Sequence, residues 1–300
     1  MKKGIVLVLL ICVSSILFAQ TDPRDIDYGS FEQALKEPSK VYSIRISDQY
    51  FTEIPKSILK LKNLESLSLR DCSVKEIPMW LKELPNLKKL DLSNNGLTEI
   101  PPAIFELTGL EQLCLYDNHF TRIPNDIKRL TKLQELHLEG CEFSEPPVVL
   151  ASLKQLNGLS LNACKLNKIP DFIFTMPQLE YLFLWENDIQ EIPDSIVLLQ
   201  KMVCLNLTDN KIAHVPDALF ELSKLKKLFL SANKLTELPA AIARLTSLSE
   251  FYTGENNLTT LPEELLKMKW LEYIDLRHTF LSADTVNWLR NGLPDLYIDL

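Results

Sequence analysis

Ten prolines recur along this 300-residue chain at a constant spacing. They stand at positions 55, 78, 101, 124, 147, 170, 193, 216, 239 and 262, so every interval is 23 residues. The residue before the proline is Ile, Val or Leu in nine of the ten cases, and it is Pro146 in the other. A period of this length indicates a row of stacked units, because one such unit is too small to bury its own apolar face.

Apolar residues occupy fixed places inside each unit, in the pattern L-x-x-L-x-L-x-x-N-x-L-x-x-I-P. The L-x-L alternation predicts a short strand whose two leucines point to the core and whose other residues point outward. The third unit shows the pattern in full, with Leu87, Leu90, Leu92, Asn95, Leu97, Ile100 and Pro101.

From roughly residue 41 to residue 284, these units resemble the leucine-rich repeat family in its 23-residue form with a Leu/Ile-Pro step. The resemblance implies an α/β fold, a curved solenoid or horseshoe with a parallel concave β-sheet and short helical or irregular convex segments. Family members of this type are commonly non-enzymatic protein-interaction scaffolds. Bacterial exported members often meet envelope or host ligands.

One polar position also repeats, six residues before the proline. We expect the side chains there to bond to backbone groups of neighbouring units and so form a ladder. The proline has no N–H, and we expect it at the first position of a short convex helix. The ladder residues are Gln49, Cys72, Asn95, Asn118, Cys141, Cys164, Asn187, Asn210, Asn233 and Asn256.

The two ends depart from the repeat and are expected to cap the solenoid. Ser30 to Gln33 resembles a capping box that opens a helix through Glu37, which Pro38 would end. Residues 282–291 predict an amphipathic helix, and 296–300 a last strand. The expected division is a signal peptide at 1–19, an N-terminal cap at 20–40, about eleven repeats at 41–281 and a C-terminal cap at 282–300.

The first residues have the order of a secretory signal peptide. Lys2 and Lys3 precede an apolar run over 4–18, and Ala19 is followed by polar residues. The run is shorter than the roughly 20 residues that cross a bilayer, so cleavage after Ala19 is favoured over an uncleaved anchor. The sequence therefore predicts an exported protein, periplasmic, surface-exposed or secreted, with no membrane span after cleavage.

Five cysteines remain after removal of the predicted signal, an odd number that leaves at least one thiol unpaired. Cys141 and Cys164 occupy equivalent places in adjacent units, about 5 Å apart at the spacing of strands. That distance permits a disulfide, but parallel side chains make the geometry poor. Reduced ladder thiols are favoured, and a bridge is the alternative.

Charge and motifs exclude several functions. The formal charge is −8, from 32 basic and 40 acidic residues, which argues against nucleic acid as a partner. The common short signatures of nucleotide, hydrolase and zinc chemistry do not occur, and no cofactor is expected. The sequence thus favours a binding module over an enzyme.

Aromatic residues are enriched at the outward strand positions. Exposed aromatic side chains grouped in this way indicate a recognition hot spot, and a protein or peptide ligand is favoured. A glycan stacking on Trp185, an envelope structural role, or rings that merely pack on one another are the alternatives. The predicted partner-binding residues are Tyr116, Tyr181, Phe183, Trp185, Phe229 and Tyr252, and Tyr273 is a seventh outward aromatic.

Seven residues before the proline, six of eleven units carry an acid and none carries Lys or Arg. A basic partner or a cation is one interpretation of this stripe. Support of the local backbone is the favoured one, since acidic side chains often serve turns. The residues are Asp48, Asp71, Asp117, Glu186, Asp209 and Glu255.

Asp91, Cys114 and His137 share one outward column on successive strands, near Glu139 and Tyr116. A Cys–His–acid site needs the imidazole between thiol and carboxylate, whereas Cys114 is in the middle here. The same group with His119 is a candidate metal site, but an open sheet gives ligands little enclosure. Neither catalysis nor metal binding is favoured.

Overall fold

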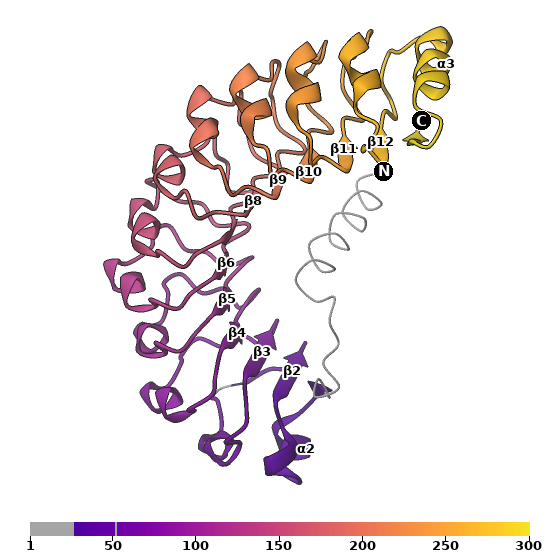
Figure 1. Cartoon of the computed structure of the whole chain (residues 1–300). Helices are drawn as coiled ribbons and strands as arrows, with labels where there is room; N and C mark the ends of the chain where they lie inside the picture. The colour runs from indigo at the N-terminus through magenta and orange to yellow at the C-terminus, as the bar shows by residue number, and fades with distance from the viewer. Residues whose placement is uncertain (1–26, 52) are drawn as a thin grey trace.

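The computed structural model describes residues 27–51 and 53–300, which form one crescent with a continuous sheet on its inner, concave side (Figure 1). The sheet has thirteen strands, all parallel and ordered as in the sequence. The strands are β1 (Asp27–Tyr28), β2 (Ser43–Ser47), β3 (Ser66–Arg70), β4 (Lys89–Asp91), β5 (Gln112–Cys114), β6 (Glu135–His137), β7 (Gly158–Ser160), β8 (Tyr181–Phe183), β9 (Cys204–Asn206), β10 (Lys227–Phe229), β11 (Glu250–Tyr252), β12 (Tyr273–Asp275) and β13 (Tyr297–Asp299).

The outer, convex side consists of single turns of 3-10 helix, one for each repeat (Figure 1). Because a 3-10 helix is wider than a strand, this difference in width curves the sheet inward. The turns are η1 (Pro38–Lys40), η2 (Lys56–Lys60), η3 (Met79–Glu83), η4 (Pro102–Glu106), η5 (Asn125–Arg129), η6 (Val148–Ser152), η7 (Asp171–Thr175), η8 (Asp194–Leu198), η9 (Asp217–Glu221), η10 (Ala240–Arg244) and η11 (Glu263–Lys267).

The repeated leucines fill the space between sheet and helices. Leu90 on β4 pairs in register with Leu113 on β5, and both are fully or almost fully buried. Burying one such side chain contributes about 2 kcal/mol, so a continuous row of them supplies most of the stability of the solenoid. The predicted curved leucine-rich solenoid is confirmed.

The prolines hold a slightly different place from the predicted one. Pro55 is the residue before the helix rather than its first residue, with φ −69° and ψ 130°, and its carbonyl accepts a hydrogen bond from the Ile58 N–H. The other prolines of the series also precede their helices. Because the missing N–H lies outside the helix there, the ring stiffens the entry to the turn without removing a hydrogen bond.

The predicted asparagine ladder is present. Asn95 is 3% exposed, and its Nδ2 donates to the carbonyls of Leu69 and Leu92 at 2.8 Å. Its Oδ1 accepts from the N–H groups of Cys72 and Val74 at 3.1 and 2.9 Å. One side chain thus satisfies the backbone of two adjacent repeats at the point where the chain leaves the sheet.

Helices cover both ends of the crescent, at α2 (Phe31–Ala34) and α3 (Ala283–Gly292). The Ser30 hydroxyl caps α2 by accepting from the Gln33 N–H at 3.1 Å. The first helix is shorter than predicted, because α2 ends at Ala34 and Pro38 begins the separate turn η1. The second helix and the last strand are present as α3 and β13, close to their predicted bounds.

The predicted signal peptide at 1–19 and its cleavage site lie outside the described residues. Within residues 27–51 and 53–300, every helix is too short or too polar to cross a lipid bilayer.

Candidate functional site: the central concave surface

Three neighbouring strands form the middle of the concave face. Backbone pairing holds β6, β7 and β8 in register residue by residue. Their outward side chains form a small surface, which we call the central concave surface. It comprises Glu135, His137 and Glu139 from the β6 repeat, Gly158, Ser160 and Asn162 from the β7 repeat, and Tyr181, Phe183 and Trp185 from the β8 repeat.

The aromatic residues predicted as partner contacts differ in exposure. Phe183 and Phe229 keep only 4% and 3% of their surface exposed, and they pack with Cys204 into a small apolar cluster outside the main core. The prediction of exposed rings is therefore wrong for these two. Large rings on nearby strands meet over a smaller residue and shield the sheet. The partly exposed members of the predicted set are Tyr116, Tyr181, Trp185 and Tyr252.

Four aromatic rings continue toward the C-terminal end as a stack. The centroids of Phe229 and Tyr252 are 4.3 Å apart, those of Tyr252 and Tyr273 4.8 Å, and those of Tyr273 and Tyr297 5.7 Å. The first two distances match the spacing of adjacent strands, which allows parallel strands to stack rings in register. Tyr252 thus stabilises the sheet, and its role as a partner contact stays a prediction.

His137 joins two carboxylates on the same strand face. Its Nδ1 is 3.3 Å from Glu139 Oε1, its Nε2 is 3.9 Å from Glu135 Oε2, and the residue is 8% exposed. Burial lowers the pKa of His137, but the two glutamates outweigh burial and raise that pKa to about 10. Burial raises the pKa of Glu139, yet the contact with His137 holds it below its ordinary value. His137 is therefore protonated at neutral pH and lies as a histidinium between two carboxylates.

The β7 repeat provides a low floor between its neighbours. Gly158 has no side chain, and a Cβ built there would lie 3.3 Å from Glu135 Cγ, so the glutamate lies over this strand. Ser160 and Asn162 are 0% and 2% exposed. Asn162 donates to the Ser160 hydroxyl at 2.8 Å and accepts from the Trp185 N–H at 2.9 Å. These bonds hold the floor and the backbone at Trp185 in fixed positions.

Sequence reasoning included His137 and Glu139 only in the catalytic and metal-binding alternatives, and it missed Glu135, Ser160 and Asn162. The signal for Glu135 was present. Glu, His and Glu alternate at 135, 137 and 139, so all three point outward from one strand. The signal for the floor was the run of small outward residues in the β7 repeat. Small residues form a floor only where the adjacent strands carry large side chains.

Asp91, Cys114 and His137 occupy adjacent strands in the predicted register. Asp91 accepts hydrogen bonds from the Ser68 hydroxyl and the Ser93 N–H. Burial, followed by the charge of Asp91, raises the pKa of the Cys114 thiol well above its ordinary value. A thiol of that kind is a weak nucleophile, and His137 faces glutamates instead of the thiol. The catalytic interpretation has no support in this geometry.

The predicted metal-binding alternative is not assembled either. His119 follows the ladder residue Asn118, and its N–H donates to the Leu97 carbonyl in the turn beyond the strand. Over the part of the chain that the structure describes, no three His, Cys, Asp or Glu side chains are placed to hold a metal ion.

Two family profiles match the chain over its central part. One, described as a leucine-rich repeat region, covers residues 55–160, and another, described as leucine rich repeat, covers 154–212 and 200–253. The chain belongs to the leucine-rich repeat family. A comparison with curated proteins gives no match.

Solved structures of other leucine-rich repeat proteins share the fold. A leucine-rich repeat protein of Leptospira interrogans has a TM-score of 0.58 at 22% identity, over 91% of this chain and 99% of that one. An internalin of Listeria monocytogenes has 0.69 at 20%, over 90% of this chain and 76% of that one. The plant peptide hormone receptor RGFR1 in complex with RGF2 has 0.56 at 26%, over 87% and 51%.

In this leucine-rich repeat protein the acidic stripe marks a turn. The residue seven before the proline has a positive φ, between 52° and 72°, in every repeat. Asp and Asn tolerate this left-handed conformation better than most residues, which supports the backbone interpretation of the stripe. The eleven residues are Asp48, Asp71, Asn94, Asp117, Gly140, Ala163, Glu186, Asp209, Ala232, Glu255 and His278.

This conformation predicts a stabilising substitution. Ala232 has a φ of 55°, where a Cβ is strained, so Ala232→Gly is expected to raise the free energy of unfolding by about 1 kcal/mol. Ala240→Gly in η10 is the control, and it should lower that free energy instead. Urea denaturation followed by circular dichroism measures both. A loss of stability in Ala232→Gly would contradict the left-handed backbone conformation at this position.

Cys72, Cys114, Cys141 and Cys164 form no disulfide with one another. Cys164 Sγ donates to the carbonyls of Leu138 and Asn162, both at 3.3 Å, in the way that an asparagine amide does elsewhere in the ladder. Burial raises the pKa of Cys141 to about 12. Protonated thiols that donate to backbone carbonyls agree with the favoured reduced ladder.

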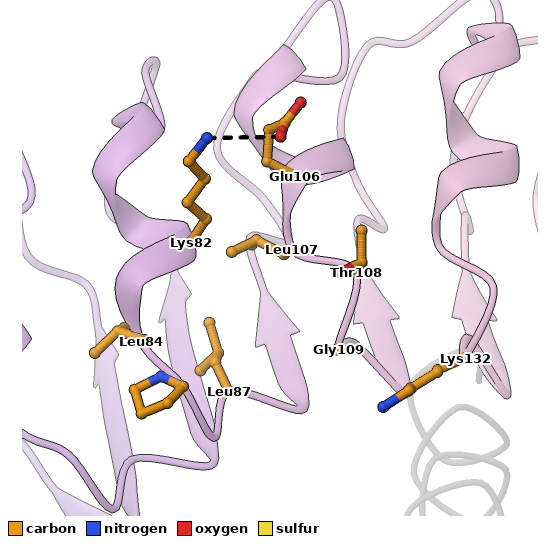
Figure 2. A pocket seen from close by; sticks show the side chains of 9 residues that line it. Lys82, Leu84, Leu87, Glu106, Leu107, Thr108, Gly109 and Lys132 are labelled. Carbon is orange, nitrogen blue, oxygen red and sulfur yellow. Dashed lines mark ion pairs between the residues drawn. The ribbon is translucent and has the colours of Figure 1, made fainter.

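A hollow of about 250 Å³ lies away from the concave face, between η3 and η4 (Figure 2). Lys82 points across it to Glu106 at 3.7 Å, and the same carboxylate pairs with Arg129 at 2.7 Å. These ion pairs occupy Lys82 and Glu106, whereas Lys132 at the other side of the hollow is in no such pair among the described residues.

Proposed function

We propose that this leucine-rich repeat protein is a non-enzymatic binding module that recognises a protein or peptide through its concave face. The observation that supports it most is Trp185, a partly exposed residue of the central concave surface whose backbone N–H donates to the buried Asn162. Tryptophan and tyrosine dominate the energetic centres of protein interfaces. The central concave surface gathers both around a fixed floor.

The comparisons support this proposal in general terms. The internalin and Leptospira structures carry the same scaffold, and the related plant receptor was solved in complex with RGF2. The signal-like segment at 1–19 supports export, so we further propose that the ligand is met in the periplasm, at the cell surface or outside the cell.

Removal of the Trp185 ring tests the proposal. We expect Trp185→Ala to reduce recovery of a protein partner from envelope or host extracts by about tenfold or more, because a central tryptophan often carries several kcal/mol of binding energy. The measurement is quantitative mass spectrometry of a pull-down with the mature chain. The expected shift in the melting temperature is small, since the ring is outside the leucine core.

Trp80→Ala is the matched control, because Trp80 is also partly buried but lies on the convex turn η3. Partners that are recovered equally with wild type and with both variants would place binding on another face. Recovery lost with Trp80→Ala and kept with Trp185→Ala would contradict the proposal directly.

A glycan-binding adhesin is the second candidate, because the flat ring of Trp185 lies beside polar groups that suit a sugar. A glycan array with wild type and Trp185→Ala separates this candidate from protein binding. If neither extracts nor glycans give a Trp185-dependent ligand, an envelope structural role takes the place of both.

A further inference from the structure

The central concave surface has two unlike walls. On the β6 side, Glu135 and Glu139 flank His137, and on the β8 side Tyr181 and Trp185 present partly exposed rings. The strand between them contributes only a glycine and short polar side chains to the floor. An acidic wall therefore faces an aromatic wall across one strand.

Basic side chains are absent from the whole middle of the concave face. The outward positions of the five described repeats from β5 to β9 include no lysine or arginine. Outward lysines stand on the two strands just beyond them, Lys89 on β4 and Lys227 on β10, and Lys227 is paired with Glu250 at 2.8 Å. The acids at these positions are Glu135 and Glu139, and Asp117, Glu186 and Asp209 stand in the turns that follow their strands.

The acidic wall is also incompletely paired. One histidinium stands between two carboxylates, so the group of three carries a net negative charge. Glu135 Oε2 and Glu139 Oε2 are buried without a hydrogen-bond partner among the described residues, and His137 Nε2 lies 3.9 Å from Glu135 Oε2, beyond hydrogen-bond distance. Buried polar atoms in proteins are nearly always satisfied, so the two unpartnered carboxylate oxygens point to a missing donor. The leftover negative charge of the group favours a cationic donor over a neutral one.

We infer that the ligand presents a positively charged segment, with an Arg or Lys side chain lying across β7 between the acidic and the aromatic wall. The inference rests on the proposed function and specifies the chemistry of its partner. A guanidinium or ammonium group can donate to the carboxylates while it lies over the face of an aromatic ring. Arginine fits best, because its planar group does both at once.

The test uses three bead-displayed libraries of short random peptides with the same content of aromatic and aliphatic residues. Fixed positions carry Arg or Lys in one library, Gln in another and Glu in the third. With fluorescent wild-type protein, we expect about tenfold more positive beads in the basic library than in the Gln library. We expect Glu135→Gln/Glu139→Gln to abolish that preference.

Glu191→Gln/Glu237→Gln is the matched control, because it removes two exposed acids outside the concave strands and should keep the preference. If both double variants lose the preference equally, general electrostatic attraction explains it and the inference fails. Trp185→Leu keeps all charges and is a second test that does not disturb the buried ion pairs. It should reduce the ratio of basic to Gln beads, and an unchanged ratio contradicts the aromatic wall.

The failure of this inference and that of the proposed function are distinguishable. Trp185-dependent binding that favours the Gln or Glu library overturns the cationic segment and leaves concave recognition standing. If none of the libraries gives Trp185-dependent beads, the cationic segment is overturned, and a negative pull-down then overturns the proposed function as well.

Discussion

Replacement of Asn95 by alanine is expected to lower the free energy of unfolding by about 4 kcal/mol, because it leaves several buried backbone groups unpaired. The side chain donates to Leu69, Leu92 and Ser93 carbonyls and accepts from two N–H groups of the preceding repeat. A buried group that loses its partner keeps its desolvation penalty. The midpoint of urea denaturation, with circular dichroism and tryptophan fluorescence as probes, measures the loss.

Cysteine is the informative control at this position, since the chain itself uses Cys72, Cys141 and Cys164 there. A thiol donates to the carbonyls, as Cys72 Sγ does to Ile46 at 3.5 Å and Arg70 at 3.2 Å. We expect Asn95→Cys to lose about half as much stability as Asn95→Ala. Equal losses in the two variants would mean that hydrogen bonding at this position does not account for the effect.

Replacement of His137 by glutamine is expected to cost about 3 kcal/mol of unfolding free energy at neutral pH, because it leaves two partly buried carboxylates without a cation between them. His214→Gln is the control, as His214 is exposed on the surface of the solenoid. It should change stability by less than about 0.5 kcal/mol. The same denaturation measurement applies.

The loss in His137→Gln should depend on pH in a defined direction. The pKa of His137 is raised to about 10 in the folded protein, from an ordinary value of 6.5. Its charge therefore stabilises the fold fully below 6.5, and this contribution declines as the pH rises through about 10. The pKa of Glu139 is lowered, so its contribution is present above its ordinary value and declines in acid.

We therefore expect the difference between wild type and His137→Gln to be largest between about pH 5 and pH 7 and to shrink toward about pH 10. Denaturation midpoints across that range give the profile. A difference that grows with rising pH would show that the imidazole is neutral in the folded protein, and it would remove the ion pairs from our description of the acidic wall.

The repeat made most of the fold predictable. Once the 23-residue period is found, the register of every strand follows from the proline spacing, and Leu90 must face Leu113. The ladder was predictable for the same reason, since one polar position recurs where the chain turns. The short α2 was not, because the length of a four-residue cap depends on contacts with the first coil instead of on a repeated pattern.

The candidate site was only partly predictable. The position within the repeat placed Trp185 and Phe229 on the concave face. The exposure of each ring, however, depends on the side chains of the adjacent strands. Phe229 is covered because Tyr252 stacks on it at 4.3 Å and it packs in one cluster with Phe183 and Cys204, whereas Trp185 is outside that cluster and stays partly exposed. Sequence reasoning on each column alone therefore cannot separate a shielding ring from a contact.

Site-specific photocrosslinking tests the central claim most directly. Benzoylphenylalanine is placed at Tyr181, in the central concave surface, or at Val148, which is 65% exposed on the convex turn η6. Concave recognition predicts a discrete protein or peptide adduct from the substituted Tyr181 position and none from the Val148 position. An adduct from the Val148 position alone would contradict it, because the ligand would then bind the convex face.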